Sequence, residues 1–362
     1  MSRSKNRGGS GRPTMVDVAV KAGVSQATVS LVLNGSPGAT LTSATRRRVY
    51  EAAEEVGYRF VRRNSQKSTD PHSVIVFIAD ELTADPWVAL AYEGAREKAS
   101  QLGVDICLEV SNGDPDVEAA IVERMRRLTV RGFIYASIVT RAIEVPPALR
   151  GQRVVLVNGY DAKRAFASVL PANLLGARAA TERLLAAGCR RIGFINGQQG
   201  VESSRDRLRG YRQALASNDI PYDADLVRPG SFQPPSGYEQ THELMSLASP
   251  PDAIFCANDL MAIGCLEALK ELHISVPGDI PVIGFDDREI AQYTRPPLTT
   301  MRLPQRQMGE IAAELLLDGT TDLDPRLNQI KVECELVERD SVPRPERQTV
   351  QSESVIRALV QS

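Results

Sequence analysis

The sequence predicts a small all-α head followed by a longer α/β domain built from parallel sheets. Three observations support this prediction. Residues 1–67 carry 12 Lys and Arg against 4 Asp and Glu, whereas the remaining residues carry 31 against 41. Three short segments of the basic part have the apolar period of a helix, and β-rich runs alternate with helical periods from Val74 onward. The two parts are expected to meet partners of different charge.

The composition is typical of a soluble globular protein with reduced thiols. The chain has 362 residues, of which 43% are hydrophobic and 24% charged, so two or three domains are expected. The longest apolar runs are far shorter than the ~20 residues of a membrane span, and the first residues lack a secretory signal. The 5 cysteines include no Cys-x-x-Cys pair, which favours buried thiols over disulfides or a zinc site. We expect a cytoplasmic protein that is not bound to a membrane.

The head begins with two short helices. Residues 1–13 are rich in Gly, Ser and Arg without an apolar period, so a disordered basic tail is expected. Thr14 and Asp17 form a capping-box pattern at the start of the first helix, and Gly23 is suited to end it. Because Ser25 can cap a second helix directly afterwards, the two helices are joined by a tight turn.

A third amphipathic helix completes the head. It is expected to begin after the cap Thr42 and to end before Gly57. The apolar faces of the three helices can share one small core. The sequence therefore predicts a helical domain at 14–60, followed by a linker at 61–73.

The long second part alternates strands and helices, as in parallel sheets that are covered on both faces. The expected strands are 74–79, 104–108, 132–136, 154–157, 191–195, 253–256 and 282–285, and the expected crossover helices are 118–128, 176–187 and 262–272. These runs are too many for one small sheet and divide near Pro171, which predicts two lobes. Ligands of open parallel sheets bind at the carboxyl ends of the strands, so a cleft between the lobes is the expected site.

Two segments of the head resemble the helix-turn-helix of the LacI/GalR family of bacterial transcription regulators. They are TMVDVAVKAGVSQATVSLVLNG (14–35) and TSATRRRVYEAAEEVGY (42–58). The resemblance implies that the second helix enters the major groove of DNA, with Gln26, Ala27 and Leu31 facing base edges. Gln26 can pair with adenine, whereas Ala27 and Leu31 offer apolar contact alone, so these residues do not spell an operator.

The resemblance also implies contacts to DNA phosphates, which set the register without reading the sequence. The matching residues are Thr14, Ser25, Ser30, Asn34, Thr42, Thr45 and Tyr58. Helix capping is the alternative for the Ser and Thr residues, and it is compatible with phosphate contact. For the basic run 46–48, a solvated face is as good an explanation as direct contact.

The linker departs from the family pattern. Relatives often carry a leucine that wedges into the minor groove, and an ungapped alignment places Lys67 there. An ammonium group cannot fill an unstacked base step, so less bending of the operator is expected, with Arg62, Arg63 and Lys67 contacting the groove or phosphates if the linker folds into a helix. The alternative is a shifted register in which Phe60 or Val61 is the wedge.

The resemblance continues through the long part of the chain. It implies a fold like that of periplasmic sugar-binding proteins, in which the chain crosses three times between the lobes. The matching blocks are AATERLLAAGCRRIGFING (179–197), PDAIFCANDLMAIGCLEAL (251–269), VPGDIPVIGFDD (276–287) and PPLTTMR (296–302).

The implied effector-binding domain spans 74–342. Its first lobe is 74–170 with 299–329, including a returning helix at 305–317, and its second lobe is 171–298 with 330–342, including a strand at 330–336. Residues 343–362 lie outside the family blocks, and a mobile tail is favoured over a tetramerising coil because no heptads repeat.

A pocket for a small polar effector is also implied, in which charged groups grip hydroxyls and aromatic rings stack on the ligand. The matching residues are Asp85, Trp87, Ser203, Arg207, Phe232, Asn258 and Asp286. For Arg207, Asn258 and Asp286 a structural role is the alternative, and for Trp87 and Phe232 it is core packing.

One position departs from the family's pocket pattern. Ala172 precedes Asn173 where relatives often carry Asp, so one polar anchor is missing and no relative's ligand can be copied. A sugar or sugar derivative is the expected effector, and a purine or other nucleoside-type compound is the alternative.

Enzymes are the main class to exclude. The sequence contains no Gly-x-Ser-x-Gly elbow, Walker A loop, dinucleotide-binding glycine motif or His-Glu-x-x-His motif. The histidines His72, His242 and His273 stand far apart, so no catalytic residue, metal or cofactor is expected. A transport receptor would share the two lobes but has no use for a basic head. The sequence thus predicts a homodimeric DNA-binding regulator that is controlled by an effector. The resemblance implies a repressor, because members of the family are more often repressors.

Overall fold

The computed structural model describes residues 14–34, 43–56, 73–82, 86–317 and 329–344. The chain forms two compact units. The first unit contains the chain up to Gly176 together with Gly200–Arg207 and Arg302–Glu335, and the second contains Ala177–Gln199, Leu208–Met301 and the chain from Leu336 onward. None of the helices in these ranges is long and apolar enough to cross a membrane.

The head consists of helices α1 (Met15–Ala22), α2 (Gln26–Asn34) and α3 (Ser43–Glu55). The predicted capping box is present, because the Asp17 amide donates to Thr14 Oγ1 and the Thr14 amide donates to Asp17 Oδ2. Gly23 ends α1 in the left-handed conformation, with φ +64°. Apolar side chains of the three helices share one core. The expected cap Thr42 and the residue Gly57 lie outside the described residues.

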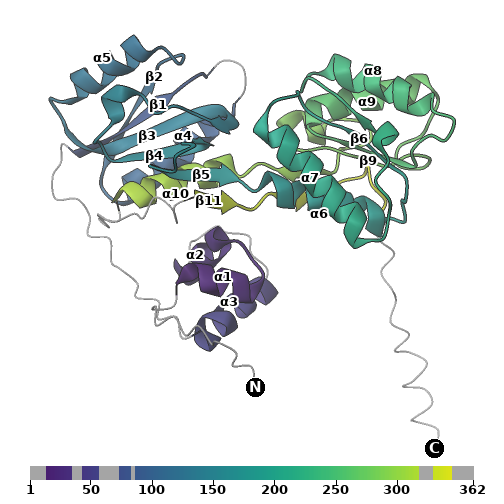
Figure 1. The fold of residues 1–362 in the computed structure, drawn as a ribbon, viewed down its shortest axis with the longest axis horizontal. Helices are drawn as coiled ribbons and strands as arrows, with labels where there is room; N and C mark the ends of the chain where they lie inside the picture. Colours follow the sequence, from purple (N-terminus) through teal and green to yellow (C-terminus); the bar gives the residue numbers. More distant parts are fainter. Residues whose placement is uncertain (1–13, 35–42, 57–72, 83–85, 318–328, 345–362) are drawn as a thin grey trace, which may run out of the picture. The chain divides into compact units, whose positions relative to one another are not determined.

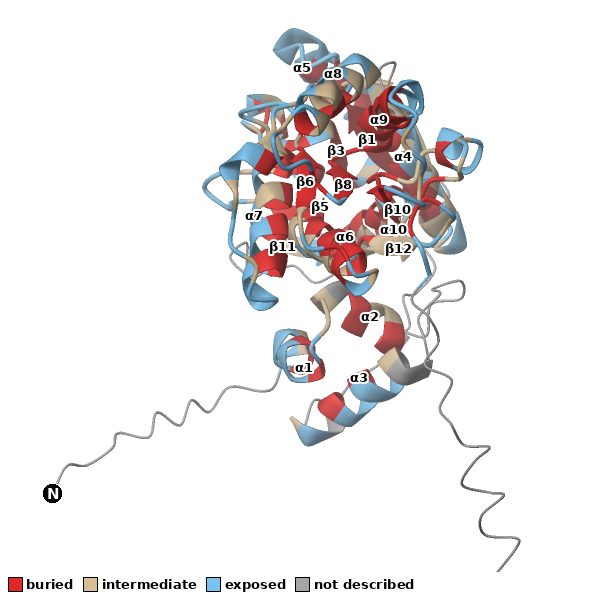
Figure 2. Ribbon diagram, turned by 90° about the vertical axis from the view of Figure 1, so that its right-hand side faces the viewer, coloured by how far each residue is buried: buried red, intermediate tan, exposed pale blue. Residues whose placement is uncertain are grey.

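Six parallel strands form the sheet of the first unit among the described residues (Figure 1). Their order is β11 (Gln329–Val332), β5 (Ala167–Pro171), β4 (Val154–Tyr160), β3 (Thr129–Ala142), β1 (Ser73–Ala79) and β2 (Asp105–Val110). Helices α4 (Trp87–Gln101) and α10 (Gln305–Leu317) cover one face, and α5 (Pro115–Met125) covers the other. Because both faces are covered, β1 is buried at every position (Figure 2).

The second unit has a four-stranded parallel sheet. Its order is β7 (Val227–Arg228), β6 (Ile192–Ile195), β8 (Ala253–Cys256) and β9 (Val282–Ile283). Its helices are α8 (Pro234–Met245), α9 (Asp259–Glu271) and the larger parts of α6 (Asn173–Ala186) and α7 (Glu202–Ser217), whose first residues belong to the first unit. In its core, the Phe194 ring stacks on Tyr211 at 5.2 Å and on Phe255 at 4.8 Å between ring centroids. The remaining elements are the 3-10 helices η1 (Pro147–Leu149), η2 (Ala224–Leu226) and η3 (Glu289–Gln292), and the strand pair β10 (Thr300–Arg302) and β12 (Glu335–Val337).

The expected strands and crossover helices are present, but each crossover helix begins earlier than expected. Helices α5, α6 and α9 start at Pro115, Asn173 and Asp259 rather than at 118, 176 and 262. The apolar period does not mark where the first turn of a helix begins, so each expected start is three residues late. Side-chain caps stabilise two of these turns: Asp114 accepts from backbone amides of α5, and Asn258 accepts from an amide of α9.

The prediction that residues 330–336 add a strand to the second lobe is wrong. Strand β11 pairs with β5 in the sheet of the first unit, with Ile330 opposite Val169. Val332 is buried in the first unit's core and Ile330 packs against that core, so apolar burial decides the placement. The chain then continues into β12, which pairs with β10.

Helices α4 and α10 pack with their backbones in contact. A Cβ atom on Gly94 would lie 1.9 Å from the Arg306 carbonyl oxygen, and one on Gly309 would lie 1.8 Å from the Ala91 carbonyl oxygen. These two glycines let residues 305–317 return to a unit formed mostly by the first half of the chain.

We expect Gly309→Ala to destabilise the protein by about 3 kcal/mol, because the added methyl group forces two helix backbones apart. Urea unfolding of the full chain measures this change. Ser100→Ala, at an exposed position of α4, is the control and should stay within about 0.5 kcal/mol of the unmodified protein. Equal stability of the two variants would contradict the close approach.

Candidate functional site

Helix α2 presents several residues assigned to DNA by the resemblance. Gln26, Ser30 and Leu31 are partly exposed along it, and Thr45 on α3 is partly exposed as well. The capping alternative holds for Thr14 and also for Ser25, whose hydroxyl accepts from the Thr28 amide at 3.0 Å. Ala27 and Asn34 lie on α2, but the structure does not describe their side chains, and Thr42, Tyr58, Arg62, Arg63 and Lys67 lie outside the described residues.

Part of the basic run on α3 faces solvent. Arg47 and Arg48 are exposed, and Arg47 Nε lies 3.8 Å from Glu51 Oε1. Lys21 on α1 pairs with Glu55 at 2.7 Å, and both side chains are more than half exposed. Such exposed pairs add little to stability, so these cations are accessible to a polyanion.

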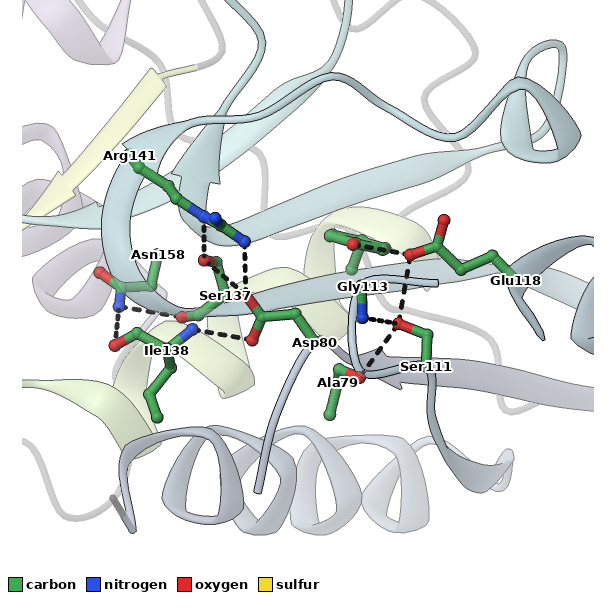
Figure 3. Close-up of polar contacts among 10 residues, drawn as sticks. Ala79, Asp80, Ser111, Gly113, Glu118, Ser137, Ile138, Arg141 and Asn158 are labelled. Atoms are coloured by element: carbon green, nitrogen blue, oxygen red, sulfur yellow. Dashed lines mark hydrogen bonds and ion pairs between the residues drawn. The ribbon is translucent and has the colours of Figure 1, made fainter. Parts of the chain in front are cut away.

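The carboxyl ends of β1 and β3 carry a buried polar network in the first unit (Figure 3). Asp80, which directly follows β1, is 5% exposed. Its carboxylate accepts from Ser137 Oγ at 2.8 Å, from the Ile138 amide at 3.0 Å and from Arg141 Nη2 at 3.0 Å. A buried carboxylate is thus held by one charged and two neutral donors.

The network extends to the end of β4. Asn158, with φ +56°, donates from Nδ2 to the carbonyl oxygens of Ser137 and Ile138 at 3.0 and 3.1 Å. Its Oδ1 accepts from Thr140 Oγ1 at 2.7 Å. Asp80, Ser137, Thr140 and Asn158 are not among the site residues predicted from the sequence. Their signal is a polar residue directly after a buried strand, or near the end of one.

Arg207 is fixed at the same edge by Asn173. Its Nε and Nη2 donate to Asn173 Oδ1 at 3.1 and 3.0 Å, and Asn173 Nδ2 donates to Thr140 Oγ1 at 3.4 Å. The preceding Ala172 is buried, and its amide donates to the Val332 carbonyl oxygen at 2.7 Å. Asn173 therefore supplies the polar contact to Arg207 although Ala172 departs from the family pattern.

A second network in Figure 3 fixes helix α5 to the sheet. Glu118 Oε1 accepts from Ser111 Oγ at 3.1 Å and from the Tyr135 hydroxyl at 2.8 Å. Burial and the adjacent Glu118 carboxylate raise the pKa of Tyr135 well above its usual range, so the hydroxyl remains a donor. This network is structural.

Two predicted effector residues of the second unit contact each other. Asn258 caps α9 by accepting from the Met261 amide at 2.9 Å, and its Nδ2 donates to the Phe232 carbonyl oxygen at 3.0 Å. The capping alternative therefore holds for Asn258, while Phe232 is partly exposed with φ +63°. Because β8 and β9 are neighbours, Asn258 and Asp286 follow adjacent strands.

The other predicted effector residues that the structure describes are buried. Asp286 is 5% exposed, and its amide donates to the Met301 carbonyl oxygen at 2.7 Å. Ser203 and Arg207 lie one turn apart in the amino-terminal part of α7. Trp87 begins α4 and is 7% exposed, and Asp85 lies outside the described residues.

Comparison with known proteins identifies the family. Residues 14–59 match the model of bacterial regulatory proteins of the lacI family, and residues 181–342 match a periplasmic binding protein-like domain. The HTH-type transcriptional regulator CelR of Thermobifida fusca is 33% identical over 338 residues, which cover 91% of this chain and 98% of CelR. The chain belongs to the LacI family.

Solved structures agree with this assignment. The CelR–cellobiose complex has 31% sequence identity and a TM-score of 0.61, and the match covers 91% of this chain and all of that one. The lac repressor dimer bound to operator and the anti-inducer ONPF has 26% identity and a TM-score of 0.62, and the match covers 91% and 99% of the two chains. This LacI-family protein has regulators rather than enzymes as relatives, including the repressor CytR of Escherichia coli K12, which is 31% identical over 91% of this chain and 96% of CytR.

We expect Asn173→Ala to lower the free energy of unfolding by about 2 kcal/mol, because two donors of the buried Arg207 lose their acceptor. Asn173→Asp keeps that acceptor and should recover most of the loss. Urea unfolding compares the two variants. An alanine variant as stable as the unmodified protein would show that Asn173 does not hold Arg207.

Proposed function

We propose that this protein is a cytoplasmic, homodimeric repressor that binds a near-palindromic operator through α2. The supporting observation is the capped, three-helix head, which leaves Gln26, Ser30 and Leu31 accessible on α2. The excess of basic residues in 1–67 supplies the attraction to phosphates. A homodimer places one head on each half-site, as expected for a symmetric operator.

DNA binding should weaken steeply with salt. A protein that neutralises six to ten phosphates loses about 10³- to 10⁵-fold in affinity between 50 and 200 mM salt. Fluorescence anisotropy of the full chain, on duplexes selected from a random pool, measures the slope. Binding that is insensitive to salt would contradict the electrostatic part of the proposal.

Gln26→Ala should lower affinity for the selected duplex by roughly 1–3 kcal/mol and relax the preference at one base pair in each half-site. The same anisotropy assay, with single base-pair substitutions in the duplex, measures both effects. Gln101→Ala, on the exposed surface of α4, is the matched control. A uniform loss across all duplexes would assign Gln26 to the backbone rather than to a base.

We further propose that a small polar effector, a sugar or sugar derivative, controls operator affinity. The buried charged groups Arg207 and Asp286 support this proposal, because Asp286 follows a strand of a parallel sheet and Arg207 is held by Asn173, which follows β5. The solved structure of the CelR relative is a complex with cellobiose, which makes disaccharides the first compounds to test.

A thermal-shift panel of sugars and nucleosides should yield a stabilising compound, with about 2.7 kcal/mol of stabilisation at a hundredfold excess over Kd. Asp286→Ala and Arg207→Ala should each weaken binding and so reduce the shift, whereas Asp340→Ala, at an exposed position, should not. Operator DNA should change the compound's affinity by the factor by which the compound changes DNA affinity. Unchanged affinity in both alanine variants would refute the proposed effector role of these two residues, and a nucleoside hit would favour the second ligand class.

A further inference from the structure

The loop that carries Asp286 has an unfavourable backbone. Asp286 and Asp287 are consecutive residues with φ +113° and +56°, in a region that favours glycine. Such residues cost on the order of 1–3 kcal/mol each and persist where neighbouring groups hold them. The question is which groups hold this pair.

Asp259 is the first of these groups. It is fully buried at the start of α9. Its Oδ2 accepts from the Arg288 amide at 2.7 Å, its Oδ1 accepts from Thr300 Oγ1 at 2.6 Å, and its own amide donates to the Phe285 carbonyl oxygen at 2.8 Å. One residue thus binds the backbone immediately before and immediately after the strained pair.

The local sequence accommodates the Asp259 carboxylate. A Cβ atom on Gly284 would lie 2.3 Å from Asp259 Oδ1, so a side chain at that position would displace the carboxylate. Burial raises the pKa of Asp259 well above its usual range, and the nearby Asp286 carboxylate raises it further, while the bonds from Thr300 and the Arg288 amide lower it. The two hydrogen bonds therefore favour the ionised form of Asp259, whereas burial and the Asp286 carboxylate oppose it.

Arg339 is the second group. Its Nη2 donates to Asp287 Oδ1 at 2.6 Å, its Nη1 donates to the Leu298 carbonyl oxygen at 2.8 Å, and its amide donates to Thr299 Oγ1 at 3.0 Å. The Arg339 and Asp287 side chains are 19% and 9% exposed, so this ion pair is largely protected from water. Arg339 lies shortly after Leu336, where the chain re-enters the second unit.

We propose that Asp259 and Arg339 are positioning residues, which hold the left-handed Asp286–Asp287 pair so that the Asp286 carboxylate is oriented for the effector. This inference rests on the proposed effector role of Asp286. Without the hydrogen bonds of Asp259 and Arg339, the loop relaxes toward ordinary backbone conformations. The protein must then restore the strained loop conformation whenever an effector binds. That cost lowers effector affinity without a direct contact.

Arg339→Met tests the contacts made by the Arg339 side chain, because it keeps the length of the side chain and removes the guanidinium. Arg339→Lys restores a cation opposite Asp287. Arg295→Met is the matched control, since the Arg295 guanidinium is exposed and donates to the carbonyl oxygens of Tyr293 and Thr294. Asp259→Asn tests the contacts made by the Asp259 side chain, because it replaces one carboxylate oxygen by a hydrogen-bond donor.

Hydrogen exchange of the full chain without ligand is the first measurement. In Arg339→Met and Asp259→Asn, the amides of residues 286–288 should exchange roughly tenfold faster, while the core strands β6 and β8 keep their protection. Arg339→Lys should fall between these variants and the unmodified protein, and Arg295→Met should not change. Unchanged exchange at 286–288 in Arg339→Met would overturn the proposal, whether or not a ligand is known.

Calorimetric titration with cellobiose is the second measurement. Arg339→Met should weaken binding roughly tenfold in the unmodified background and leave it unchanged in the Asp286→Ala background, because Arg339 acts through Asp286. The same loss in both backgrounds would overturn the positioning role. If cellobiose does not bind the unmodified protein, cellobiose is not the effector. The hydrogen-exchange result alone then supports or overturns the positioning role of Asp259 and Arg339.

Discussion

The cost of burying polar groups at the carboxyl ends of parallel strands is the constraint on which both units depend. A buried carboxylate or guanidinium is tolerated where neighbouring donors or acceptors satisfy it. Asp80 in the first unit accepts from Ser137, Ile138 and Arg141, and Asp259 in the second accepts from Thr300 and the Arg288 amide. These buried polar groups are therefore held in place by the fold itself.

Several side chains for which we propose a binding role also have a structural role. Asn258 caps α9 and also holds the Phe232 backbone, and Thr14 and Ser25 cap the helices that carry the head's accessible residues. Capping fixes where these residues lie, and it is compatible with the binding roles that we propose for them. The same reasoning applies to Asn173, which holds the buried fork of Arg207.

The sequence pattern does not predict which sheet residues 330–336 join. Residues 330–336 have the composition of a strand, but composition does not say which sheet edge is open. Strand β11 joins β5 because Val332 is buried in the core that α4 and α10 cover, and those helices approach closely through Gly94 and Gly309. The networks at Asp80 and Asn158 were missed for a similar reason, since their members come from β1, β3 and β4 and are separated by many residues in the chain.

The sequence by itself determined the elements and the family. The apolar periods, the caps at Thr14 and Ser25, and the left-handed Gly23 are local, because their interactions join residues a few positions apart. The tertiary structure alone decided which buried polar groups meet, such as Arg339 with Asp287 and Asp259 with Thr300. These contacts join residues more than forty positions apart, and packing of whole elements brings them together, so no local pattern of the chain encodes them.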